Sequence, residues 1–90
     1  MKIHLVKRKG HLEKFDERKV YASCYAACLS GHLKKEKAEK IAAAVTRDVN
    51  KWIKDRKKVS SNDIFRLAIQ LLKKHDAEIA FLYETHRDIS

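Results

Sequence analysis

Proline is absent from this 90-residue chain, and glycine and cysteine occur only twice each. Long irregular loops are therefore not expected, because glycine and proline are the strongest breakers of helices and strands. No run of about 18 apolar residues is present, so the sequence predicts no membrane-spanning helix. The first residues, MKIHLVK, lack the apolar region and cleavage site of a signal peptide, and we expect a cytoplasmic protein.

Metal-binding and catalytic patterns are also missing. Cys24 and Cys28 have no second cysteine pair, so they make a poor zinc site, and we expect buried, reduced thiols instead. The five histidines lack the spacing of metal ligands: His4, His11, His32, His75 and His86. The chain contains no GxSxG, HExxH, Walker loop or GxGxxG sequence. The sequence therefore predicts neither a structural metal nor an enzyme.

Positive charge is what the chain has in excess. It carries 21 Lys and Arg against 12 Asp and Glu, which gives a formal net charge of +9. Such a balance favours anionic partners, namely nucleic acids, nucleotides or acidic protein surfaces. Solvated lysines on helix surfaces are an equally good explanation for many of these charges.

The hydrophobic pattern predicts a short hairpin followed by helices. Residues 2–15 read as two strands around a turn at Lys9 and Gly10, where glycine can adopt a positive φ. The four predicted helices span about residues 17–30, 35–56, 61–75 and 77–87. The fold class is therefore mainly α with a small β-hairpin, in a single domain covering residues 1–90.

Capping residues and apolar stripes support these helices. Asp16 is a natural N-cap, Gly31 stands where the first helix should stop, and Ser60 with Asp63 resembles a capping box. Ser61 is an equally good cap. The segment KDRKKV, residues 54–59, breaks the helical pattern and is predicted to be a connector. The apolar stripes contain Val20, Cys24, Ala27 and Cys28 in the first helix, Ala38, Ile41, Val45, Val49, Trp52 and Ile53 in the second, Ile64, Leu67, Ala68, Leu71 and Leu72 in the third, and Ile79, Leu82, Tyr83 and His86 in the last.

The basic residues around the hairpin suggest an anion site. Lys7 and Arg8 end the first strand, and Lys19 lies in the first turn of the first helix. Ser61 stands at the start of the third helix, and a helix N-terminus offers N–H groups and partial positive charge to a phosphate. If the hairpin folds over that helix start, these four residues converge on one polyphosphate. A solvated basic hairpin is the alternative interpretation.

Three segments resemble the ATP-cone domain. LVKRKGHLEKFDERKV, residues 5–20, resembles its opening motif, and VSSNDIFRLAIQLL, residues 59–72, resembles its second signature. IAFLYETHRDI, residues 79–89, is similar to its closing helix. The resemblance covers roughly residues 3–89. It implies a β-hairpin lid over a four-helix bundle that binds ATP or dATP. The nucleotide can bind with or without Mg²⁺.

The resemblance also implies roles for individual residues. The phosphate-binding positions of the family correspond to Lys7, Arg8, Lys19 and Ser61. The positions around the base correspond to Val6, Glu13, Asp16 and Val20, although core packing accounts for the two valines equally well. Gly10 corresponds to the glycine of the turn.

Some residues depart from the family pattern. Lys9 replaces the usual Asp or Asn of the turn. Phe65 stands where some members carry a His that contacts phosphate, a bond that a phenyl ring cannot make. Phe81 and Leu82 stand where Arg and Phe are expected, while Arg87 corresponds to a late basic residue of the family.

The leading hypothesis is a non-catalytic module whose nucleotide changes conformation or oligomeric state. The resemblance implies a ribonucleotide reductase or a transcription-related protein as the regulated partner, and it allows a homo-oligomer. A small basic nucleic-acid-binding domain is one alternative. A protein-interaction module with a degenerate nucleotide pocket is the other.

Overall fold

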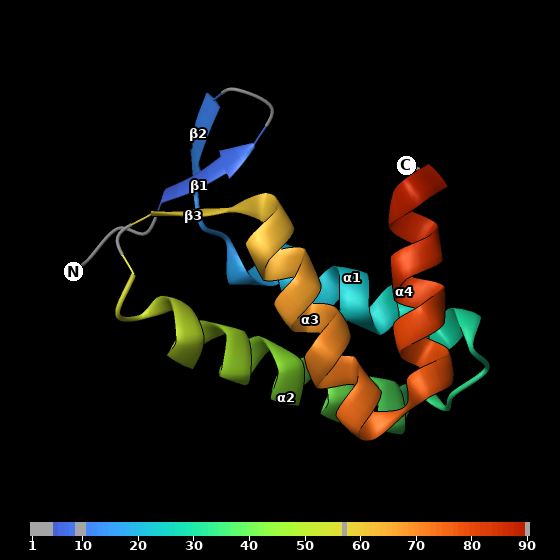
Figure 1. The fold of residues 1–90 in the computed structure, drawn as a ribbon. Coiled ribbons are helices and arrows are strands. Elements are labelled where there is room, and N and C mark those ends of the chain that lie inside the picture. The colour runs from blue at the N-terminus through green and yellow to red at the C-terminus, as the bar shows by residue number, and fades with distance from the viewer. Residues whose placement is uncertain (1–4, 9–10, 57, 90) are drawn as a thin grey trace.

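The computed structural model describes the backbone of residues 5–8, 11–56 and 58–89, and the side chains of residues 12, 14–56 and 58–85. Its class is mainly helical, with four helices, as predicted (Figure 1). The elements are β1 (Leu5–Arg8), β2 (His11–Lys14), α1 (Glu17–Ser30), α2 (Lys35–Ile53), β3 (Lys58–Ser60), α3 (Ser61–His75) and α4 (Ala77–Ile89). The predicted turn at Lys9 and Gly10 lies outside the described residues.

The described strands form one small sheet in the order β2-β1-β3. β1 pairs antiparallel with β2, with Lys7 opposite Leu12 in the register. β1 also pairs parallel with β3, with Val6 opposite Val59. Figure 1 shows this sheet at one end of the molecule, above the starts of α1 and α3.

The prediction for residues 54–59 was wrong at its C-terminal end, and the second helix was predicted too long. α2 ends at Ile53 rather than residue 56, and Lys58–Ser60 is a strand rather than a connector. Val59 is only 6% exposed, since the short strand carries it into a small core cluster with Ile53. A strand of this length leaves no alternating pattern to recognise, and its partner β1 is distant in sequence.

The predicted caps are present. The Asp16 carboxylate accepts a hydrogen bond from the backbone N–H of Arg18 at the start of α1. At the start of α3, the Ser60 hydroxyl accepts from the Asp63 N–H at 3.0 Å, and the Asp63 carboxylate accepts from the Ser60 N–H at 3.2 Å. This capping box decides that Ser60, not Ser61, is the N-cap.

The core lies where the four helices meet. All four predicted apolar residues of α1 are buried, and α2 buries its predicted face except Trp52, which is half-buried. In α3 the buried residues are Ala68, Ile69 and Leu72, so Ile69 was missed and the flanking Ile64, Leu67 and Leu71 are only partly buried. Ile69 is buried because α3 packs against both α2 and α4, so its buried face is wider than the predicted stripe.

Gly31 has a role that the sequence did not indicate. Its φ is −84°, so it is not the left-handed residue at the end of α1; His32, with φ 65°, takes that conformation. A Cβ at position 31 would lie 2.2 Å from Cδ1 of Ile79 and 3.2 Å from Cδ1 of Leu82. Gly31 therefore allows α4 to approach the end of α1 closely.

No helix in the described ranges is long and apolar enough to cross a membrane.

Candidate functional site

The backbone of β1 lies beside the first turn of α3. In the parallel pairing of β1 with β3, Lys7 is opposite Ser60, and Ser60 is also the N-cap of α3. Neighbouring strands are about 4.8 Å apart, so the backbone of Lys7 is one strand spacing from this helix start. The short strand β3 is what joins the hairpin to α3, and this connection was not visible in the sequence.

The first turn of α3 combines helix N–H groups with one carboxylate. The backbone N–H groups of a helix's first turn and the helix dipole both favour an anion. Asp63 already uses its carboxylate in the capping box, and its hydrogen bonds with Ser60 hold the pKa of that carboxyl below its usual value. Because Asp63 is negative, further cations would favour an anion bound here.

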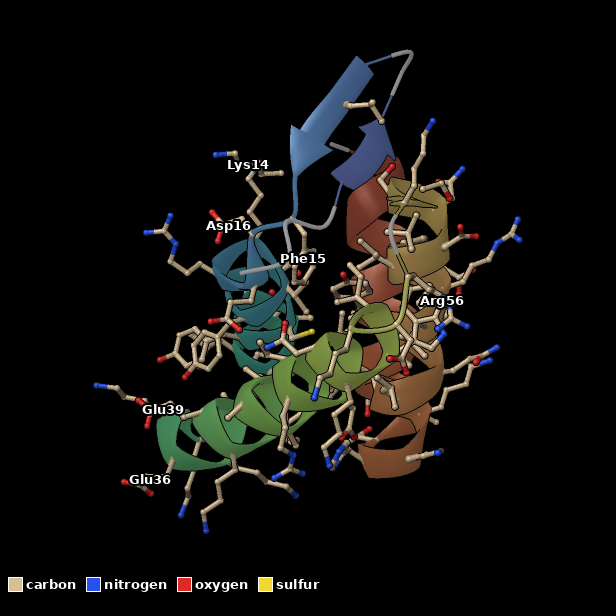
Figure 2. The ribbon with its side chains drawn as sticks, turned by 90° about the vertical axis from the view of Figure 1, so that its left-hand side faces the viewer. Lys14, Phe15, Asp16, Glu36, Glu39 and Arg56 are labelled. Carbon is tan, nitrogen blue, oxygen red and sulfur yellow. The ribbon has the colours of Figure 1, made fainter. Side chains whose placement is uncertain are left out.

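Asp16 lies where the hairpin enters α1. Its Oδ1 accepts from Arg18 N and Nε at 3.0 and 3.1 Å, and its Oδ2 accepts from Arg18 Nη2 at 3.2 Å. The side-chain and backbone hydrogen bonds from Arg18 lower the pKa of Asp16. Figure 2 shows Lys14 and Asp16 pointing away from the helices, whereas Phe15 between them points inward. Phe15 packs against both core clusters, so it fixes the hairpin to the bundle.

A chain of side-chain contacts below the sheet links three helices. The Ser23 hydroxyl of α1 donates a hydrogen bond to the Tyr83 hydroxyl of α4 at 3.3 Å. The Tyr83 ring stacks on Phe65 of α3, with ring centroids 5.4 Å apart and an angle of 26° between the rings. Phe65 is one turn along α3 from Ser61, and Ser23 is one turn along α1 from Lys19. The contacts therefore lie on the faces of α1 and α3 that also carry the predicted phosphate-binding residues.

Sequence reasoning missed this role of Tyr83 and Phe65. Tyr83 was assigned to the apolar stripe of its helix, and Phe65 was noted only as a departure from the family pattern. In the structure the phenyl ring of Phe65 forms an aromatic stack that joins α3 to α4. Two aromatics 18 positions apart give no sequence signal of contact, because it depends on how α3 and α4 pack.

The structure describes the side chains of only some of the remaining predicted site residues. Lys19 is exposed in the first turn of α1, and Ser61 is half-buried in the first turn of α3. Val20 is 6% exposed and belongs to the main core cluster. The side chains of Val6, Lys7, Arg8, Glu13 and Arg87 and the whole of Gly10 lie outside the described residues.

Comparison with known protein families gives one match. The family model described as the ATP cone domain matches residues 3–89, nearly the whole chain. The chain belongs to the ATP-cone family. Comparisons with curated proteins and with solved structures find no significant match.

Membership of this family implies a general function for the domain. ATP-cones are regulatory, non-catalytic modules that bind ATP or dATP. The matched range includes the hairpin, the N-cap of α3 and the Phe65–Tyr83 stack. Among the described residues of this ATP-cone, no group of three His, Cys, Asp or Glu side chains is placed to hold a metal ion.

Proposed function

We propose that this ATP-cone binds ATP or dATP at the junction of β1 with the first turn of α3. The observation that carries the proposal is the register of the sheet, in which Lys7 is opposite the N-cap Ser60. This register brings the backbone of the basic strand Leu5–Arg8 to a helix N-terminus. Both parts attract phosphate, the strand through its side-chain cations and the helix through its N–H groups.

The phosphates are bound by Lys7, Arg8, Lys19 and Ser61. Asp63 in the same helix turn is negative, and the cations from β1 and α1 offset its repulsion of the phosphates. Arginine can donate two hydrogen bonds to one phosphate, and lysine supplies a compact charge. Any Mg²⁺ comes with the nucleotide and completes its coordination with water, as this ion commonly does.

The base is recognised next to the hairpin, by Glu13 and Asp16 with Val6 and Val20 beside it. Asp16 accepts three hydrogen bonds from Arg18, and a carboxylate has about four acceptor sites, so it retains capacity for one more donor. The exocyclic amine of adenine is such a donor. Val20 is held in the core, so it contributes an apolar wall rather than a mobile contact.

Binding is coupled to regulation through the sheet. β1 is the central strand, and β3 leads directly into α3, so a nucleotide on β1 and α3 fixes the hairpin relative to the bundle. In this proposal the hairpin acts as a lid, and its closed position favours one conformation or oligomeric state of the cone. The regulated partner is a ribonucleotide reductase or a transcription-related protein, and the cone itself catalyses no reaction.

Calorimetric titration with ATP and with dATP tests this proposal. We expect saturable heat with at least one nucleotide and a higher midpoint of thermal unfolding, since a ligand at 100 times its Kd stabilises the native state by about 2.7 kcal/mol. The double variant Lys7→Gln/Arg8→Gln should lose binding. The matched control Lys35→Gln/Lys37→Gln removes the same charge from exposed residues of α2 and should keep it.

Two results would contradict the proposal. Absence of both heat and stabilisation at about 1 mM nucleotide, a concentration that detects even weak binding, excludes a functional pocket. The second result is tight binding of DNA or RNA that weakens steeply with salt, without nucleotide binding. It would show that the net charge of +9 serves to bind nucleic acid. A stable protein partner without either response would indicate an interaction module with a degenerate pocket.

A further inference from the structure

A second surface of the molecule is a groove between α1 and α2. These helices run antiparallel as neighbours in sequence, and an open cavity of about 560 Å³ lies along their outer junction. Its lining residues come from the first half of α1, between Glu17 and Tyr21, and from the second half of α2 and its C-cap, between Ala43 and Lys54. In α1, Arg18 and Tyr21 project from a different face than Lys19 and Ser23, because successive helix residues are 100° apart. The groove therefore lies on a different face of α1 from Lys19 and Ser23, and it adjoins the proposed nucleotide site where Arg18 pairs with Asp16.

The floor of the groove is largely apolar. The Tyr21 ring stacks on Tyr25 with centroids 6.1 Å apart and an angle of 11° between the rings. Ala43 faces the same cavity from α2, and Thr46 is buried with its hydroxyl donating to the Ala42 carbonyl at 2.7 Å. Asn50 of α2 donates a hydrogen bond to the Glu17 carboxylate of α1, which ties the two walls together. The Thr46 hydroxyl on the floor is thus already paired, and one hydrogen bond joins the two walls.

The rim of the groove is cationic. Arg18, Arg47, Lys51 and Lys54 stand against one lining carboxylate, Glu17. Arg18 is paired with Asp16, and Arg47 makes only a long contact of 3.7 Å with its neighbour Asp48. Within the described part of the chain, neither Lys51 nor Lys54 forms an ion pair. The two rim lysines that form no ion pair are therefore at the C-terminal end of α2.

The opposite end of α2 carries charges of both signs. Glu36 and Glu39 lie in its N-terminal part and point away from the bundle (Figure 2), and they alternate with Lys35, Lys37 and Lys40. From Ala43 to Lys54 the groove follows about three helical turns, or roughly 17 Å. A ligand that matches this surface is elongated, apolar on one side and acidic towards one end.

We propose that the groove between α1 and α2 binds an acidic amphipathic helix of a partner protein. Apolar residues of that helix, spaced at i, i+3 or i+4 and i+7, lie over Tyr21 and Ala43, and its carboxylates pair with Lys51, Lys54 and Arg47. A nucleic-acid backbone fits less well, because phosphates would leave the apolar floor uncovered and would approach Glu17 and Asp16.

A synthetic peptide tests this proposal. The probe is a fluorescent peptide of about 12 residues, long enough to span the groove as a helix, with leucines at i, i+4 and i+7 and glutamates towards one end. The comparison probes are a scrambled peptide of the same composition and a DNA duplex. We expect the amphipathic peptide to bind at least tenfold more tightly than the scrambled one, as measured by fluorescence anisotropy.

Variants of the protein locate the binding. Lys51→Glu/Lys54→Glu should weaken binding of the peptide at least tenfold, because like charges then face each other. Lys37→Glu/Lys73→Glu changes the net charge equally at exposed lysines outside the groove and should have little effect. Ala43→Glu places a bulky charge on the floor, at an exposed position that tolerates it, and should also weaken binding tenfold or more.

Four results would overturn the proposal. The first is that both peptides bind equally, and the second is that the groove and control variants lose the same peptide affinity. The third is that the amphipathic peptide does not bind at about 1 mM. The fourth is that the DNA duplex binds more tightly than the peptide and that Lys51→Glu/Lys54→Glu weakens this binding. The last result would assign the surface to nucleic acid. Because the groove variants leave Lys7, Arg8, Lys19 and Ser61 unchanged, they should keep their thermal stabilisation by ATP or dATP, which separates a failure here from a failure of the proposed nucleotide site.

Discussion

Replacing Gly31 by alanine tests how closely α4 packs on the end of α1. The backbone tolerates alanine, because the φ of Gly31 is −84°. The added methyl group, however, would lie 2.2 Å from Cδ1 of Ile79 and 3.2 Å from Cδ1 of Leu82. Ile79 is only 1% exposed, so its side chain cannot move aside into solvent. The neighbouring core must shift to accept the methyl group.

Two opposing contributions determine how Gly31→Ala changes the free energy of unfolding. Overpacking a core typically costs about 1–3 kcal/mol. Restricting the unfolded chain by replacing glycine with alanine returns about 0.4–1 kcal/mol. The close contact should dominate, which leaves a net loss of about 1–2 kcal/mol. For a domain of this size, such a loss lowers the midpoint of thermal unfolding by roughly 4–16 °C.

A double-mutant cycle with Ile79→Val separates the contact from other effects. Ile79→Val removes the Cδ1 atom and by itself should cost about 0.5–1.5 kcal/mol. Combined with Gly31→Ala, it should cost less than the sum of the two single changes, because the methyl group then fits. Ser30→Ala, at an exposed position of the same turn, is the control and should have little effect. If Gly31→Ala is as stable as the original protein, or if the two changes are additive, the proposed close contact is wrong.

Two further predictions concern titratable groups. Burial raises the pKa of the Cys24 thiol to about 12, so the folded protein at pH 8 should resist alkylation at Cys24, which should proceed rapidly in denaturant; fast labelling of the native state, measured by mass spectrometry, would contradict this. The capping hydrogen bonds from Ser60 lower the pKa of Asp63 in the folded state, so this carboxylate stabilises the fold above its unfolded pKa of about 3.9 and that stabilisation is lost as the pH falls below it. The drop in the unfolding midpoint between neutral pH and about pH 2 should therefore be smaller in Asp63→Asn than in the original protein, and an equal drop would show that the cap does not contribute.

The proposed nucleotide site and the groove use opposite sides of α1. Its first turn carries Lys19 towards the site below the sheet, while Arg18 and Tyr21 line the groove with α2. Neighbouring residues of one helix can thus serve two ligands, because a helix presents each of them in a different direction. Asp16 and Glu17 connect the two regions, since Asp16 pairs with Arg18 and Glu17 bonds to Asn50.

The sequence by itself determined the elements whose signals are local. Asp16 and the pair Ser60 and Asp63 mark two helix starts because capping needs only residues within one turn. The apolar stripe of α1 was also predictable, since its helical period is set by the backbone alone. The family was recognisable for the same reason, because its motifs are contiguous stretches of sequence.

Only the tertiary structure decided which of these elements meet. The pairing of Lys7 with Ser60 depends on a three-residue strand that has no pattern of its own. The Phe65–Tyr83 stack and the need for glycine at position 31 both depend on where α4 packs. Contacts between residues distant in sequence depend on how whole helices pack, and a short local pattern does not record that packing.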